Sequence, residues 1–191
     1  MDTKTVQLTS LPVVGESYSQ TTELDGKTWQ CFLWHTSSRQ LRRDVPGGSA
    51  SISESHDQRY FLEIDLSADE RVTFTSRKQF DDLLEAASAA ETFTWKTVEH
   101  AGRTWFKDPN REIWHCAFGP GDQGELIKAD DGRFLMKRSI TPRYGETYEI
   151  SVQRYNSIGT PDGTGLAVTS FAEAAAIVST APAYLSELVT R

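Results

Sequence analysis

The chain contains 191 residues, of which 38% are hydrophobic and 25% are charged, and its net charge is −7. This composition is typical of a globular protein with a buried core, and it excludes disordered, collagen-like and coiled-coil proteins. The amino terminus lacks the apolar run of a signal peptide and no stretch is long enough to cross a bilayer, so we expect a cytoplasmic protein with no membrane partner. The acidic balance disfavours nucleic acid as a partner and favours a protein with a basic face.

The first half of the chain predicts strands. Residues 1–22 are polar and irregular, with one short strand expected at 6–8. Aromatic and β-branched residues predict three further strands, at 28–35, 60–66 and 71–74. The stretch 46–55 is rich in Pro, Gly and Ser and has no period, so it predicts a mobile loop.

A helix is expected after these strands. Ser76 and Gln79 have the spacing of a capping box, in which the serine hydroxyl accepts from the amide three residues further on. Apolar side chains then recur with helical spacing, at Phe80, Leu83, Leu84 and Ala87. The sequence therefore predicts an amphipathic helix that begins near residue 76.

The second half repeats this order with longer connections. Strands are expected at 93–98, 103–106, 112–118, 125–128, 134–138, 147–155 and 166–168. Asp131-Gly132 predicts a type I′ hairpin turn, since both positions tolerate a positive φ. Ser170 and Glu173 form a second capping box before a helix that continues through Ala174 and Val178, and a further helical turn is expected at 184–189.

A sequence motif occurs twice. Residues 23–29 read ELDGKTW and residues 99–105 read EHAGRTW. Three later pairs of blocks follow in the same order, at 34–35 and 114–115, at 62–64 and 148–150, and at 72–76 and 166–170. The offset widens from 76 to 94 residues, so the second copy must carry insertions, which are best tolerated in loops.

We therefore interpret the chain as an α+β protein with an internal duplication. The first repeat would occupy 1–91 and the second 92–191, each with about four antiparallel strands followed by a helix packed on one face. The sequence leaves open whether the copies form one continuous sheet or two lobes. The two cysteines, Cys31 and Cys116, are too few for a disulfide framework, so we expect both thiols to be reduced.

Known catalytic motifs are absent from the sequence. Gly26-Lys27-Thr28 resembles the end of a phosphate-binding loop, but Thr21 stands where that loop needs glycine. Nucleophile-elbow, zinc-protease and paired-cysteine motifs are also missing. We expect no cofactor and no bound metal.

One weaker hypothesis is a metal-dependent or acid–base hydrolase. The duplicated Trp-His pairs supply His35 and His115, and Glu63 and Glu149 occupy matched positions. An imidazole oriented by a carboxylate is suited to a zinc site or to proton transfer, provided that these side chains converge. Packed histidines and solvated glutamates are the commoner outcome for such residues, so we do not favour this hypothesis.

A second hypothesis uses the tryptophans. Five of them occur in or near predicted strands, namely Trp29, Trp34, Trp95, Trp105 and Trp114. If exposed, they could stack on nucleic-acid bases beside the basic residues Arg42, Arg43, Lys137, Arg138 and Arg143. Tryptophan is highly buried on average, so we favour a core role for them.

The function we expect is non-enzymatic binding of another protein, as an inhibitor, immunity or adaptor protein. An acidic surface combined with long loops and no catalytic motif favours this function. Three loops, 45–55, 119–124 and 159–165, are expected to make the contacts. The contact residues that we expect are Asp44, Glu54, His56, Asp57, Asp122, Glu125 and Asp162.

Overall fold

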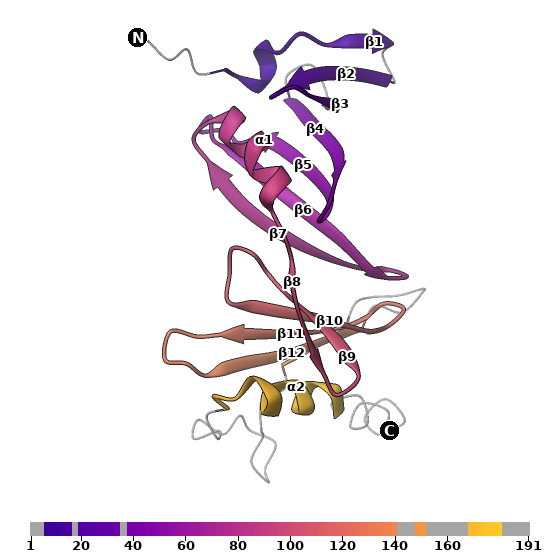
Figure 1. The fold of residues 1–191 in the computed structure, drawn as a ribbon, viewed down its shortest axis with the longest axis vertical. Coiled ribbons are helices and arrows are strands. Elements are labelled where there is room, and N and C mark those ends of the chain that lie inside the picture. The colour runs from indigo at the N-terminus through magenta and orange to yellow at the C-terminus, as the bar shows by residue number, and fades with distance from the viewer. Residues whose placement is uncertain (1–5, 17–18, 35–37, 141–147, 152–167, 181–191) are drawn as a thin grey trace. The chain divides into compact units, whose positions relative to one another are not determined.

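The computed structural model describes residues 6–16, 19–34, 38–140, 148–151 and 168–180 (Figure 1). It contains two antiparallel sheets with helices, which confirms the α+β class. The chain divides into two compact units, one formed by Met1–Leu66 with Phe74–Thr94 and the other by Ser67–Thr73 with Trp95–Arg191. None of the helices described is long and apolar enough to cross a membrane.

The first sheet is a meander in which neighbouring strands follow one another along the chain. Its order is β1 (Val14–Glu16), β2 (Ser19–Leu24), β3 (Lys27–Trp34), β4 (Ser38–Val45), β5 (Gly48–Glu54), β6 (Tyr60–Asp69) and β7 (Val72–Phe80). Helix α1 (Leu83–Thr92) follows and packs against β5. A short 3-10 helix at Leu8–Ser10 precedes the sheet.

The core of the first unit lies between this sheet and α1. Trp29, Leu41, Ile52 and Leu62 are fully buried on neighbouring strands. They meet the apolar face of α1, whose buried residues are Leu83, Ala86, Ala87 and Ala90. Small side chains on α1 allow the helix to lie close to the sheet, so the larger apolar groups of the strands fill the core.

The second sheet is also a meander. Its order is β8 (Lys96–His100), β9 (Arg103–Lys107), β10 (Ile113–Gly119), β11 (Asp122–Lys128), β12 (Phe134–Ile140) and β13 (Tyr148–Ser151), followed by α2 (Phe171–Thr180). Trp105, Cys116 and Leu126 are fully buried beneath α2. Both thiols of the chain are free, and both cysteines are buried.

The repeated motif forms the same hairpin in both units. Asp25-Gly26 and Ala101-Gly102 all have φ between 51° and 72°, as a type I′ turn requires. The threonine hydroxyl after each turn donates to the glutamate across the strand pair, at 2.5 Å for Thr28 to Glu23 and 2.6 Å for Thr104 to Glu99. The tryptophan that follows, Trp29 or Trp105, is fully buried in each case.

The pairing register continues identically beyond these hairpins. Counting from the two tryptophans, strands β3 to β6 correspond position by position to β9 to β12. The corresponding core pairs are Leu41 and Trp114, Ala50 and Gly124, Ile52 and Leu126, Leu62 and Met136, and Ile64 and Arg138.

The later blocks of the sequence alignment do not follow this correspondence. Trp34 ends β3 whereas Trp114 lies in β10, and residues 62–64 lie in β6 whereas 148–150 lie in β13. Residues 166–167 lie outside the described part of the chain. The sequence alignment therefore matches the structure only in its first block.

Three predicted elements were wrong. The strand expected at 6–8 is absent, and Leu8–Ser10 form a 3-10 helix instead. The expected loop at 46–55 is a tight turn followed by the interior strand β5, in which Ala50 and Ile52 are buried. The serines and glycines of β5 concealed its alternation of buried and exposed residues. A Cβ on Gly48 would lie 2.1 Å from the carbonyl oxygen of Asp65, so only glycine fits there. The capping box at Ser76 was also wrong, since Ser76 is buried within β7 and the helix begins at Leu83.

Other predictions held in part. The hairpin at residues 125–138 is present, but only Gly132 of the Asp131-Gly132 pair has a positive φ, so the turn is not type I′. The second capping serine is placed as expected, with the amide of Glu173 at 3.5 Å from the hydroxyl oxygen of Ser170. Each unit has more strands than the four expected. The helical turn expected at 184–189 lies outside the described residues.

Candidate partner-binding site

The turn between β5 and β6 carries three of the predicted contact residues, Glu54, His56 and Asp57. Ser55 closes this turn, because its amide donates to the carbonyl of Arg59 at 2.8 Å and its hydroxyl oxygen accepts from the amide of Arg59 at 3.2 Å. The Ser55 hydroxyl also contacts the carboxylate of Asp57 and lowers the pKa of that group. Asp57 therefore stays ionised and exposed at the tip of the turn.

The connection between β7 and α1 lies beside this turn. Arg59 bridges the two segments, with its Nε 3.5 Å from a carboxylate oxygen of Asp57 and 3.5 Å from one of Asp81. Asp82 caps α1 by accepting from the amides of Leu84 at 2.8 Å and Glu85 at 3.0 Å. The side chain of Asp81 is 90% exposed, so it is available to a partner.

Glu54 and Asp82 lie near the ring of Tyr60. Glu54 stands directly across the strand pair from Tyr60, and burial raises the pKa of its carboxyl group. The pKa of Tyr60 is raised, first by burial and then by the charges of Glu54 and Asp82. The two carboxylates therefore share one end of the first sheet.

We call this region the acidic end of the first unit. It consists of five carboxylates on two adjacent segments, namely Glu54, Asp57, Asp81, Asp82 and Glu85. Arg59 lies on the first of these segments, and Arg77 and Lys78 lie in β7 just before the second. The first unit as a whole carries 13 Asp and Glu against 8 Lys and Arg, whereas the second carries 14 against 12, so the acidic excess is concentrated in the first unit.

The other predicted contact residues lie elsewhere or serve the fold. Asp44 is exposed on β4, opposite Ser49. Asp122 binds the buried guanidinium of Arg138 at 2.6 and 2.7 Å, and Glu125 stands opposite His115. Residues 119–124 form a tight hairpin turn and the start of β11, whereas Asp162 and the loop at 159–165 lie outside the described residues.

The residues of the hydrolase hypothesis do not form a described site. His35 and the side chain of Glu149 lie outside the described part of the chain, while Glu63 pairs with Arg77 at 3.3 Å. Burial lowers the pKa of His115 to about 4; the charge of Asp108 opposes this shift, and the charge of Arg111 adds a smaller lowering. Within the described residues, no group of three or more His, Cys, Asp or Glu is arranged to hold a metal ion.

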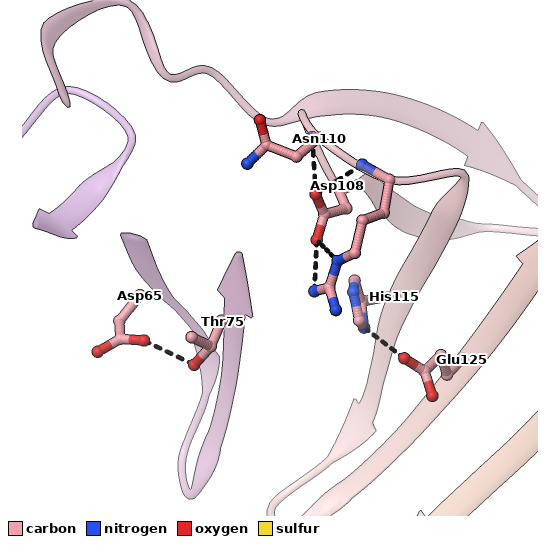
Figure 2. A network of polar contacts seen from close by, with 7 residues as sticks. Asp65, Thr75, Asp108, Asn110, His115 and Glu125 are labelled. Atoms are coloured by element: carbon pink, nitrogen blue, oxygen red, sulfur yellow. Dashed lines mark hydrogen bonds and ion pairs between the residues drawn. The ribbon is translucent and has the colours of Figure 1, made fainter. Parts of the chain in front are cut away.

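The polar side chains of Figure 2 are held by structural contacts. Asp108 is fully buried and accepts from the amides of Asn110 and Arg111 at 2.8 and 3.1 Å, and from the guanidinium of Arg111 at 2.6 and 2.9 Å. Figure 2 also shows the imidazole of His115 directed toward Glu125, at 4.0 Å. These contacts order the loop between β9 and β10 and one side of β10.

The tryptophans are mainly core residues. Trp29, Trp95 and Trp105 are buried, and Trp114 is half-buried against the rings of Phe134 and Phe171. The side chain of Trp34 is not described. Three of the five rings are therefore unavailable for base stacking, as the preferred core interpretation required.

Sequence reasoning missed Asp81, Asp82 and Glu85 as part of the site. The helix predicted to begin near Ser76 includes these three residues, and their proximity to Asp57 depends on the pairing of distant strands. A local signal was present, because two adjacent aspartates immediately before an apolar helical period are typical of a helix N-terminus.

Comparison with protein-family models, with curated proteins and with solved structures gave no significant match.

Proposed function

We propose that this chain is a non-enzymatic protein that binds a basic surface of another protein through the acidic end of the first unit. An inhibitor, immunity or adaptor protein would act in this way, and a cytoplasmic location would suit two free, buried thiols. The observation that carries the proposal is the exposure of this end: the side chains of Asp57 and Asp81 are 61% and 90% exposed. Such charges steer a basic partner and set its orientation.

The chemistry of the site supports binding over catalysis. Asp82 is engaged in helix capping, and Asp57 accepts from the Ser55 hydroxyl and faces the guanidinium of Arg59. These contacts hold the carboxylates in fixed positions on the turn and at the start of the helix. A fixed set of like charges instead favours recognition of Lys and Arg side chains.

We also propose that the two units descend from one ancestral unit. The identical hairpins and the shared register of four successive strands support this origin. The net charge of the units differs, and the described turn of the second unit that corresponds to residues 55–59 carries two carboxylates, Asp130 and Asp131. We therefore propose that the first unit makes the contact with the partner protein.

Affinity capture with matched variants tests the proposed function. The tagged protein is used to capture partners from a lysate of its natural source, with and without nuclease. The site variant carries Asp57→Asn, Asp81→Asn and Glu85→Gln, and the control carries Glu16→Gln, Asp25→Asn and Asp130→Asn, which removes the same charge from exposed positions elsewhere.

We expect one protein to be retained by the parent chain and the control at near-equal stoichiometry, and lost by the site variant. Its association rate should fall steeply with salt, since exposed charges are screened at high ionic strength. Equal retention by all three chains would exclude the acidic end as the contact. Retention that disappears with nuclease would instead favour nucleic acid.

A further inference from the structure

Helix α2 covers the second sheet with few large side chains. It packs on β11 and β12, and its buried residues are Ala174, Ala175 and Val178 (Figure 1). Gly124 lies beneath it, and a Cβ on this glycine would be 2.7 Å from Cγ1 of Val178. The helix therefore lies close to the sheet, and its larger apolar side chains, Phe171 and Ile177, are only partly buried against the core, so they supply less stabilisation than full burial would.

The C-terminal end of α2 is held by a buried arginine. Arg138 is 2% exposed, and its Nη1 donates to the carbonyl oxygen of Val178 at 2.9 Å. Its Nε and Nη2 donate to Asp122 at 2.6 and 2.7 Å, and its guanidinium lies 3.3 Å from the ring centre of Phe118. A cation at this position also interacts favourably with the negative end of the helix dipole.

The N-terminal end of α2 is attached differently. Phe171 contacts the rings of Trp105, Trp114 and Phe134 at centroid distances of 5.8 to 6.4 Å. The residue before the capping segment is tied to the sheet, because the amide of Phe134 donates to the carbonyl of Val168 at 2.8 Å. The helix is thus fixed at one end by aromatic packing and at the other by an ionic contact.

In the first unit, an aliphatic side chain stands at the position that corresponds to Arg138. Ile64 occupies the position that corresponds to Arg138, and it is fully buried. A buried ion pair stabilises a fold only weakly, because removing the two charges from water offsets much of their attraction, and apolar replacements are often as stable or more so. The ion pair of Arg138 therefore attaches α2 less strongly than an aliphatic side chain at the same position of the sheet would.

We propose that α2 is a releasable strap whose latch is the contact of Arg138 with Asp122 and Val178. The helix detaches by local opening while β10, β11 and β12 keep their pairing. Detachment uncovers the apolar surface formed by Trp114, Leu126 and Phe134. This inference does not depend on the acidic end, since all of its contacts lie within the second unit.

Hydrogen exchange on the full chain, read by mass spectrometry, tests the strap. We expect amides of α2 to show protection factors at least tenfold below those of β10 and β11, with little sensitivity to low concentrations of urea, because a local opening exposes little surface. Equal protection in the helix and the strands would overturn the proposal, since α2 would then open only when the whole unit unfolds.

The variant Asp122→Asn tests the latch. If α2 opens by breaking the contact between Arg138 and Asp122, removing the carboxylate charge of Asp122 should lower the protection factors of the α2 amides at least tenfold. The control Glu112→Gln removes a carboxylate from the surface pair with Lys107 and should leave α2 unchanged. Unchanged α2 protection in Asp122→Asn, or an equal loss in the control, would overturn the assignment of the latch. Should Asp122→Asn fail to fold, the comparison of helix and strands in the parent chain still decides the proposal.

Discussion

The two units of this chain build the same meander from different interiors. The hairpins β2–β3 and β8–β9 share a turn type, a Thr–Glu contact and a buried tryptophan. Beneath the helices the corresponding positions carry different residues, with Leu41, Ala50 and Ile64 in the first unit replaced by Trp114, Gly124 and Arg138 in the second.

This difference separates what specifies the sheet from what attaches the helix. Strand register is fixed by the tight hairpin turns and by the alternation of buried residues, and both units keep these features. Attachment of the helix depends on complementary packing, which admits more than one solution as long as total volume is accommodated. A larger ring in one place can be matched by a smaller residue in another, as the pairs containing Trp114 and Gly124 illustrate.

The largest expected effect concerns the matched tryptophans. Trp29→Ala and Trp105→Ala should each lower the free energy of unfolding of their own unit by about 3–5 kcal/mol, because each removes a large, fully buried side chain. Urea denaturation followed by circular dichroism measures the loss. A small loss of unfolding free energy in only one unit would show that the two hairpins do not contribute equally to the stability of their units.

The corresponding phenylalanine variants supply the control for this comparison. The indole Nε1 of Trp29 and that of Trp105 have no hydrogen-bond acceptor among the described residues. Replacing either indole by a phenyl ring removes a buried donor as well as packing volume, so the two effects oppose one another. Trp29→Phe and Trp105→Phe should therefore cost much less than the alanine variants.

The next effect is a pH dependence confined to the second unit. Because the pKa of His115 is about 4 in the folded chain and about 6.5 in the unfolded one, the unfolded state binds the proton first as the pH falls. The free energy of unfolding of the second unit should therefore decrease between about pH 6.5 and pH 4, by about 3 kcal/mol in total.

Denaturation of the parent chain and of His115→Gln across this pH range tests the assignment. The contribution of His115 is fully present above pH 6.5, so the two chains should differ in slope only below that value. Arg42 occupies the corresponding position of the first unit. An identical pH dependence in both chains would assign the titration to another group.

A smaller effect distinguishes the two helix caps. Asp82→Ala should cost about 1–2 kcal/mol, since it removes the acceptor for two amides of α1. Ser170→Ala should cost about 0.5 kcal/mol, because the single contact at the start of α2 is 3.5 Å long. Thermal denaturation measures both, with Asp82→Asn as the variant that keeps a capping oxygen. A costlier loss at Ser170 would contradict the ranking.

The smallest effect should be equal in the two units. Glu23→Ala and Glu99→Ala each remove the acceptor of an exposed threonine hydroxyl across a strand pair, which should cost about 0.5 kcal/mol. Urea titration of both variants, compared with the parent chain, is sensitive enough when the midpoints are measured in parallel. A clear difference between them would show that the shared hairpins lie in unequal surroundings.

Much of the strand content was accessible from the sequence. Stretches such as 28–34 and 113–118 combine aromatic and β-branched residues, and this signal does not depend on distant contacts. β5 was not predicted, because serine and glycine conceal its alternation and its buried apolar side chains, Ala50 and Ile52, are few. Composition suggested a loop where pairing with β4 and β6 imposes a strand.

The candidate site was only partly accessible for a related reason. Glu54 and Asp57 were selected because they flank a polar stretch, and this choice rested on loop character that the structure does not show at β5. Asp81 joins them through Arg59, which requires the order of the strands to be known. The same limit applies to Asp122, because only the register of β11 and β12 reveals that it neutralises Arg138.

The hairpin turns also bear on the order in which the chain folds. Asp25-Gly26 is a sequence that readily adopts two successive positive φ angles, whereas Ala101 reaches φ 51° against the steric preference of an alanine side chain. A turn that forms without strain brings its strands together more often before any core exists. We therefore expect the first hairpin to nucleate ahead of the second, so that the acidic unit acquires its structure earlier than the unit that carries α2.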